Sequence, residues 1–307
     1  MLTILFIYRF TPEEIQRLVP LLRIEEISFT NRYNPDPETA LCIVCARLSY
    51  PSRWTALADL FGRSPSWLSS IFLDVMLHLH RRFKAILEWH PSLTYERLQE
   101  YATAIERVGG VEGVWSFVDG TFKGHQRPSG GREQRVVYSG HKRKHGINFQ
   151  AIVGACGLVL SLFGPFTGTV NDWTMWRHSF IEHRLRRVMA GHNTLYIYGD
   201  PAYRSCFGVA CPFTDPRGRV FLSPKEKAFN KALSSIRVSV EQVFGQTQEL
   251  WTYNAFEKAL TAGRQPIGTF FPVAVLLTNC HTCLRGTSSA GNRFPVNPLS
   301  IEEYLTI

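Results

Sequence analysis

Three carboxylates occupy positions that suit metal-dependent phosphoryl transfer. Asp119 directly follows the apolar run Val114–Val118, and Asp200 follows a second apolar run after one glycine. Glu241 lies inside a helical pattern that covers Lys225–Leu250. If the two runs are neighbouring strands and the helix packs beside them, the three side chains converge. Converging carboxylates repel each other unless a cation neutralises them, so this arrangement calls for a bound metal.

Oxygen ligands indicate which metal to expect. Carboxylates suit the hard ions Mg²⁺ and Mn²⁺, and two such ions about 4 Å apart serve phosphoryl transfer by activating a water and stabilising the leaving oxygen. We therefore predict Asp119, Asp200 and Glu241 as catalytic residues and as ligands of two ions. Each also has an ordinary structural explanation, a turn beside glycine for the aspartates and a helix-surface pair with Arg237 for Glu241. The sequence has no GxxxxGK[ST] loop and no His/Cys cluster that competes as a zinc site.

Basic residues are concentrated beside the first acid. Between Asp119 and Gln150, seven lysines and arginines stand against two acids, and the whole chain carries a formal charge of +9. Such an excess favours a polyanionic partner, because Lys and Arg replace the counterions condensed on a phosphate backbone. A solvated basic hairpin is the alternative. The position next to Asp119 favours a DNA-backbone groove, for which we predict Lys123, Lys142, Arg143, Lys144 and Arg237.

Residues 1–110 show the spacing of helices and end at a Gly-Gly pair. Within them, a short helix over Thr55–Phe61 stops at Gly62, and a second helix starts after Ser64-Pro65 and runs towards Phe83. This pattern predicts a helix-turn-helix whose outer N-terminal turn faces DNA. Its candidate DNA-binding residues are Arg63, Ser66 and Trp67. Plain packing of two helices in a bundle explains the same pattern.

The remaining chain alternates strands and helices. Besides Val114–Val118, strands are expected at Ile147–Ala155, Leu158–Phe163, Thr194–Tyr198 and Arg219–Leu222, and helices at Trp173–Met189 and Lys225–Leu250. This order predicts a mixed α/β unit around a central sheet. The expected domains are a helical unit at 1–110, a catalytic unit at 111–265, and a helix and tail at 266–307 that pack on it.

Composition narrows the class of protein. With 45% hydrophobic and 13% aromatic residues, the chain is a folded protein. Its longest apolar stretches are too short or too interrupted by glycine to cross a bilayer, and its first residues lack the features of a secretory signal. Seven cysteines at irregular spacings indicate a reducing compartment. The pairs Cys42/Cys45 and Cys280/Cys283 are interpreted as buried thiols rather than as a zinc site.

Several motifs occur together in a characteristic order. The chain resembles the transposases of the PIF/Harbinger superfamily and the nucleases derived from them, over roughly residues 40 to 305. The motifs that carry this resemblance are Leu48–Pro51 (LSYP), Phe61–Ser64 (FGRS), Val118–Thr121 (VDGT), Tyr138–Gln150 (YSGHKRKHGINFQ), Gly168–Asp172 (GTVND), Gly199–Tyr203 (GDPAY), Arg237–Gly245 (RVSVEQVFG) and the ending Asn297–Leu299 with Glu303 and Tyr304.

The resemblance implies an RNase H-like catalytic core with a DDE triad, which falls on Asp119, Asp200 and Glu241. The GTVND motif also carries an acid in the family, so Asp172 is a further candidate, although its place before a predicted helix suits an N-cap. The resemblance also implies a nuclear setting, double-stranded DNA as substrate and a separate Myb-like protein that helps to recognise transposon ends. Because two ends must be joined, we expect at least a dimer on DNA.

Two functions of different classes follow from these observations. The first is a transposase that cuts DNA at transposon ends and transfers the freed 3′-hydroxyl strand to target DNA. The second is a domesticated, catalytically silent DNA- or chromatin-binding adaptor that keeps the fold for its surfaces. An RNase H-like enzyme acting on RNA is less favoured, because a helix-turn-helix suits duplex DNA.

Overall fold

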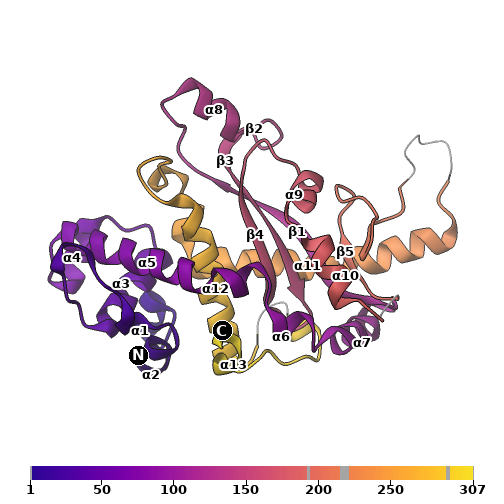
Figure 1. Ribbon diagram of the computed structural model, residues 1–307, viewed down its shortest axis with the longest axis horizontal. Coiled ribbons are helices and arrows are strands. Elements are labelled where there is room, and N and C mark those ends of the chain that lie inside the picture. Colours follow the sequence, from indigo (N-terminus) through magenta and orange to yellow (C-terminus); the bar gives the residue numbers. More distant parts are fainter. Residues whose placement is uncertain (1, 192–193, 215–220, 288–290, 307) are drawn as a thin grey trace.

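The computed structural model describes residues 2–191, 194–214, 221–287 and 291–306. The N-terminal part of this described chain is helical and forms one end of the molecule (Figure 1). Its elements are α1 (Leu2–Tyr8), α2 (Pro12–Leu21), short 3₁₀ turns at Ile24–Glu26 and Thr30–Arg32, α3 (Pro37–Ser49), α4 (Trp54–Phe61) and α5 (Pro65–Glu88).

The turn between α4 and α5 follows local signals. Gly62 ends α4 in the left-handed conformation at φ 62°, which glycine adopts without a Cβ clash. The Ser64 hydroxyl then accepts a hydrogen bond from the backbone N–H of Trp67 at 3.3 Å, and Pro65 occupies the first helical position. The pair of helices predicted from the sequence is therefore present, with the second helix continuing to Glu88.

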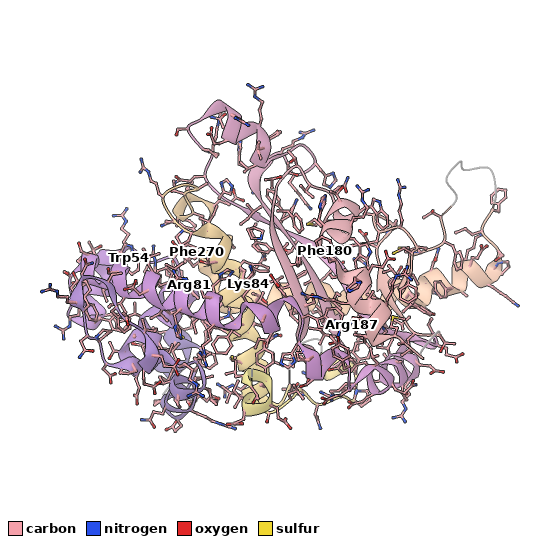
Figure 2. All side chains as sticks on the ribbon, in the orientation of Figure 1. Trp54, Arg81, Lys84, Phe180, Arg187 and Phe270 are labelled. Carbon is pink, nitrogen blue, oxygen red and sulfur yellow. The ribbon has the colours of Figure 1, made fainter. Side chains whose placement is uncertain are left out.

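Helix α5 links the helical end to the rest of the molecule. Its apolar stripe is buried, and the helix contacts both strand β4 (Val159–Thr167) and helix α12 (Ile267–Arg285). Phe72 on α5 makes edge-to-face contacts with Trp54 and with Phe270, each at 5.7 Å between ring centroids. Figure 2 labels these two partners, which belong to α4 and α12. The helical unit therefore packs against the following part through an aromatic cluster.

A mixed sheet occupies the centre of the molecule, with strands in the order β4-β3-β1-β5-β6. Strand β1 (Val114–Gly124) pairs antiparallel with β3 (Lys144–Gly154) and parallel with β5 (Tyr196–Gly199). On the outer sides, β4 is antiparallel to β3 and β6 (Val209–Ala210) is parallel to β5, while β2 (Tyr138–Ser139) pairs with the start of β3. A central mixed sheet of this kind is consistent with the expected RNase H-like fold.

Helices flank this sheet. Contacts to β1 come from α7 (Leu98–Gly109) and α11 (Pro224–Leu250), and α9 (Asp172–His178) contacts β3. Short helices α6 (Pro91–Thr94), α8 (Gly131–Val137), α10 (Ile181–Val188) and α13 (Ile301–Leu305) and the 3₁₀ turns Thr252–Ala255, Glu257–Ala259 and Gly291–Arg293 complete the described elements. By length and composition α12 resembles a membrane span, but most of its apolar window is buried inside the protein, as in a core helix.

Three sequence predictions need correction. The helix expected at Trp173–Met189 is two helices, because Phe180 adopts a left-handed φ of 54° between them. The last strand within the described residues is β6 rather than the expected strand at Arg219–Leu222. Phe221 and Leu222 are not in a strand, and residues 219 and 220 lie outside the described residues. The two residues of β6 are too few to show the alternation of apolar and polar residues by which a strand is recognised in a sequence. Finally, β1 continues to Gly124, well past the predicted end at Val118.

Candidate active site

Asp119 and Asp200 follow a matched pair of positions on two parallel strands. Val118 on β1 pairs with Gly199, the last residue of β5. Asp119 directly follows Val118, and Asp200 directly follows Gly199. Neighbouring strands lie about 4.8 Å apart, which brings the two residues side by side. Asp119 is thus not at a strand end, as the sequence indicated, but in the middle of β1, beside the point where β5 stops.

Local hydrogen bonds orient the two carboxylates. The Oδ1 atom of Asp119 accepts a hydrogen bond from the backbone N–H of Gly120 at 3.0 Å. The Oδ1 atom of Asp200 accepts one from the backbone N–H of Ala202 at 2.9 Å, which shapes the turn after β5. Each carboxylate keeps further lone pairs free for a ligand.

Asp172 joins these two acids. The N-cap of α9 is Asn171, whose side chain accepts from the backbone N–H of Thr174, so Asp172 is the first helical residue and not the predicted cap. Its carboxylate lies against Gly120 so closely that a Cβ atom there would collide with it. Glycine at position 120 is therefore what allows Asp172 to approach the residue next to Asp119.

Glu241 is turned towards a different partner. It lies on α11 with 55% of its side chain exposed, and its Oε1 atom accepts from Nη2 of Arg237 at 3.0 Å. The other terminal nitrogen of Arg237 lies 3.5 Å from Oδ2 of Asp119. The guanidinium group therefore bridges Glu241 and Asp119 and supplies the positive charge between them.

The electrostatics of the acids show an incompletely neutralised cluster. Burial raises the pKa of Asp119 to about 6; Arg237 and the Gly120 N–H oppose this rise, while Asp200 and Asp172 add to it. Burial also raises the pKa of Asp172, and Asp200 raises it further while Lys142 lowers it. Such mutual repulsion is relieved when a cation binds among the carboxylates.

These residues fit a divalent ion in donor type and in charge. Asp119 is only 17% exposed and has Arg237 as its nearest cation, and carboxylate oxygens are the ligands that Mg²⁺ and Mn²⁺ prefer. Within the described ranges, however, no three His, Cys, Asp or Glu side chains already converge tightly enough to surround one ion. For Glu241 to act as the predicted third ligand, it would have to leave Arg237.

A cavity of about 730 Å³ opens beside two of the acids. Asp172 and Asp200 line it, together with Lys142, Trp173 and Arg204. It combines carboxylates, cationic groups and an aromatic ring, which suits a polar, charged ligand. The loop that leads into Asp172 is held in place by the Asn148 amide, which donates to the carbonyl oxygen of Val170 at 2.8 Å.

The basic segment 123–144 divides into two environments. Lys142, Arg143 and Lys144 are exposed, and Lys144 forms a 2.7 Å ion pair with Glu257. Lys123 differs: it is only 4% exposed, and its Nζ atom lies 4.2 Å from the ring centroid of Phe271. Only the first three match the solvent-facing groove predicted from the sequence.

The N-terminal candidates lie at the start of α5, far along the chain from the acids. Arg63 and Ser66 are exposed, and Trp67 is partly buried between the guanidinium of Arg63 and the ring of Tyr33. The 3₁₀ turn at Thr30–Arg32 contacts the same helix through hydrogen bonds to Ser70. Their role in DNA binding stays a prediction.

Two residues near the acids had no assigned role in the sequence. Tyr203 is 2% exposed, and after burial the acids that raise its pKa are Asp172, Asp119 and Asp200. Gln150 is fully buried opposite Gly120, and neither polar atom of its side chain has a hydrogen-bond partner within the described part of the protein. Tyr203 was visible only as the last residue of the GDPAY motif, and Gln150 only as the last residue of YSGHKRKHGINFQ.

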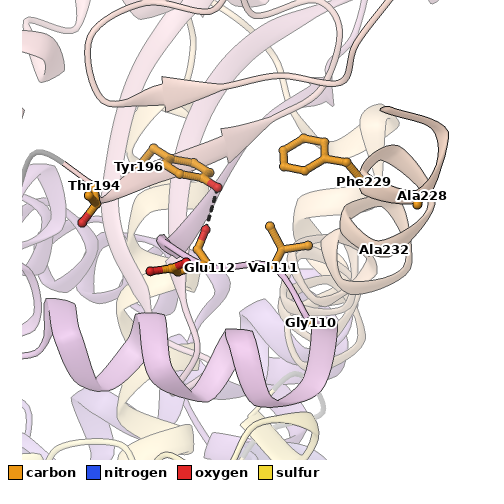
Figure 3. Close-up of a pocket in the computed structure, with 8 residues that line it drawn as sticks. All are labelled: Gly110, Val111, Glu112, Thr194, Tyr196, Ala228, Phe229 and Ala232. Carbon is orange, nitrogen blue, oxygen red and sulfur yellow. Dashed lines mark hydrogen bonds between the residues drawn. The ribbon is translucent and has the colours of Figure 1, made fainter. Parts of the chain in front are cut away.

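A different cavity, of about 740 Å³, is largely apolar. It lies between the start of β1, the start of β5 and α11, where the Tyr196 hydroxyl donates to the carbonyl oxygen of Glu112 at 2.6 Å (Figure 3). Because the acids follow the carboxyl end of β5, this cavity is at the opposite end of that strand. Its lining lacks the clustered charges that phosphoryl transfer needs.

Comparison with known proteins gives one match. A family model described as DDE superfamily endonuclease matches residues 118–279, more than half of the 307-residue chain. The matched region contains Asp119, Asp172, Asp200 and Glu241. No curated protein and no solved structure matches the chain.

Proposed function

Because the chain belongs to the DDE superfamily of endonucleases, we propose that it is a transposase of the PIF/Harbinger type or a nuclease derived from one. The observation that carries this proposal is the placement of Asp119 and Asp200 side by side after Val118 and Gly199. The raised pKa of Asp119 supports it, since the charged form of a buried carboxylate beside two other acids is stabilised when a cation binds.

The proposed metal ligands are Asp119, Asp200 and Glu241. When bound, two Mg²⁺ or Mn²⁺ ions would activate a water and stabilise the leaving 3′-oxygen of a phosphodiester. Arg237 holds Asp119 and Glu241 in place before the ions arrive, because its guanidinium contacts both. Once Glu241 turns to the aspartates, the same guanidinium is free to contact a DNA phosphate, for which its planar fork is well suited.

The surrounding residues position the substrate. Lys142 lines the cavity with Asp172 and Asp200, so its ammonium group can hold a phosphate next to the acids. We assign Asp172 a secondary role: it lies against Gly120, raises the proton affinity of its neighbours and belongs to the cavity wall. The freed 3′-hydroxyl would then attack target DNA from the same site, with no covalent enzyme intermediate.

Recognition of transposon ends is proposed to be shared. Arg63, Ser66 and Trp67 at the start of α5 approach duplex DNA in a helix-turn-helix manner, and the resemblance adds a Myb-like partner protein. A homodimer or larger assembly would join two ends, and the nucleus is the expected site of action.

The silent adaptor is favoured by one specific observation. Arg237 already pairs with both Asp119 and Glu241, as a structural cation would in a site that binds no metal. If the adaptor is correct, the acids and Arg237 serve stability alone. Cleavage distinguishes the two functions.

The decisive experiment uses the full chain on labelled duplexes that carry candidate terminal repeats. We expect nicking that requires Mg²⁺ or Mn²⁺ and leaves a 3′-hydroxyl. Tight duplex binding without any nicking in either metal, with or without a Myb-like partner, would establish the adaptor instead.

A further inference from the structure

A smaller cavity, of about 430 Å³, adjoins the cavity of the acids. It lies between the second half of β1, the segment around Lys142 and the 3₁₀ turns after α11. Lys142 lines both cavities, which makes them neighbours along one surface. A DNA strand that passes the acids can therefore continue into this second cavity.

The lining of the smaller cavity is suited to an anion. Its charged side chains are Lys123, Lys142 and Lys144 against the single acid Glu257. Glu257 is already engaged, because it pairs with Lys144 at 2.7 Å. The amides of Gln248 and Asn254 add hydrogen-bond donors. Excess positive charge with neutral donors is the composition of a phosphate site.

Lys123 is the unusual member of this set. Only 4% of it is exposed, and its Nζ atom has no hydrogen-bond partner among the described residues. Its contact is with the ring face of Phe271. Burial lowers the pKa of Lys123 to about 8, so the charged amine is held at a cost. A buried ammonium without an anion is stabilised when an anion arrives, and the flexible stem of lysine lets Nζ turn from the ring to the cavity.

We propose that this cavity binds one backbone phosphate of the DNA, away from the phosphate that is cut, with Lys123 as its anchoring cation. The inference rests on the proposed nuclease function and adds a fixed point for the strand. Asp119 and Lys123 are four positions apart on β1, which corresponds to about 13 Å at the rise of a strand. Duplex DNA rises about 3.4 Å per nucleotide along its axis. Because the backbone winds around that axis, consecutive phosphates of one strand lie farther apart than this, and the distance corresponds to at most about four nucleotides.

Replacing single DNA phosphates by uncharged methylphosphonates shows which phosphate the cavity binds. Full-length protein is titrated, without divalent ions, against duplexes in which one methylphosphonate is moved along each strand. We expect the wild-type affinity to fall about tenfold at one position within about four nucleotides of the scissile phosphate, the loss typical of a charge-assisted hydrogen bond. This measurement tests the pocket without any mutation.

Lys123→Met then assigns the phosphate to its residue. Methionine keeps the length and the apolar packing on Phe271 but removes the charge. The variant should bind the unmodified duplex about tenfold more weakly and show no additional weakening at the sensitive position. Lys225→Met, which removes an exposed lysine at the start of α11, serves as the matched control and should keep the wild-type profile.

The outcomes separate the two proposals. A flat methylphosphonate profile, or a Lys123→Met profile that equals the wild type, would overturn the phosphate pocket and leave Lys123 as a core residue on Phe271. A wild-type protein that shows the position-specific loss but never nicks DNA would overturn the nuclease and keep the pocket. Protein that binds no duplex would overturn both.

Discussion

Asp119 and Lys123 lie on the same face of β1, four positions apart. They carry opposite charges, and both side chains are largely buried. Burial raises the pKa of Asp119 to about 6 and lowers that of Lys123 to about 8, in each case disfavouring the charged form. The acid has Arg237 at 3.5 Å and other acids nearby, whereas the lysine lies against an aromatic ring. This difference supports the two proposals, a cation bound at the acids and an anion bound beside the lysine, and burial gives both charged groups some cost in stability.

The largest effect is expected at the acid. Asp119→Asn should reduce the cleavage rate by at least about a hundredfold, because a neutral amide binds a hard cation poorly and even outer contacts of metal ligands are worth about 10- to 100-fold. Nicking rates on one labelled duplex measure this, with Asp59→Asn on the exposed face of α4 as the control. Equal rates in Asp119→Asn and the wild type would remove Asp119 from the site.

Acid pH should weaken the same site. The folded-state pKa of Asp119 is raised from 3.8 to about 6, so below pH 6 the carboxyl is protonated and cannot ligate a metal. We expect nicking at saturating substrate to fall about tenfold for each pH unit below 6. Asp172→Asn removes one repelling charge and should move the midpoint to lower pH. A midpoint that stays in place would mean that Asp172 does not influence Asp119.

A smaller effect is expected from the exposed cations near the lysine cavity. Replacing Lys142, Arg143 and Lys144 together by alanine should weaken binding to all duplexes alike. It should also flatten the plot of log affinity against log salt by about 0.9 for each phosphate that is no longer neutralised. The matched control replaces Lys225, Lys227 and Lys231 on the exposed part of α11, with the same change in charge. Equal slopes in both triple variants would place the groove elsewhere.

The smallest effect concerns the free energy of unfolding, which should rise both when the charge at Asp119 is removed and when the charge at Lys123 is removed. The raised pKa of Asp119 means that the folded protein loses stability as pH rises through about 4 to 6, and the lowered pKa of Lys123 means that it gains stability as pH rises through about 8 to 10. At pH 7 both groups are charged. Asp119→Asn and Lys123→Met should therefore each raise the free energy of unfolding, by on the order of 1–2 kcal/mol. Denaturant unfolding without metal or DNA measures this, and destabilisation by either change would show that its charge is satisfied in the fold.

Much of the architecture is determined locally. Helices α4 and α7 end at the glycines Gly62 and Gly110, and α5 and α11 begin at caps visible in the sequence, Ser64 and the capping box of Ser223 with Glu226. The four longer strands follow from apolar runs, because burial on both faces of a central sheet requires them. Where the signal is short or depends on one backbone angle, as at β6 and Phe180, the sequence pattern fails.

The sequence by itself also determined which acids are candidates, since apolar runs, glycines and motif order are properties of the chain. Only the tertiary structure decided how they are paired. Strand register places Asp200 beside Asp119, the absence of a Cβ at Gly120 admits Asp172, and the packing of α11 puts Arg237 between Asp119 and Glu241. Burial divided the lysines in the same way, enclosing Lys123 and exposing Lys144. The residue type determines which charge a side chain can carry. Its environment comes from segments far apart in sequence, and that environment sets the pKa of the side chain and its need for a counterion.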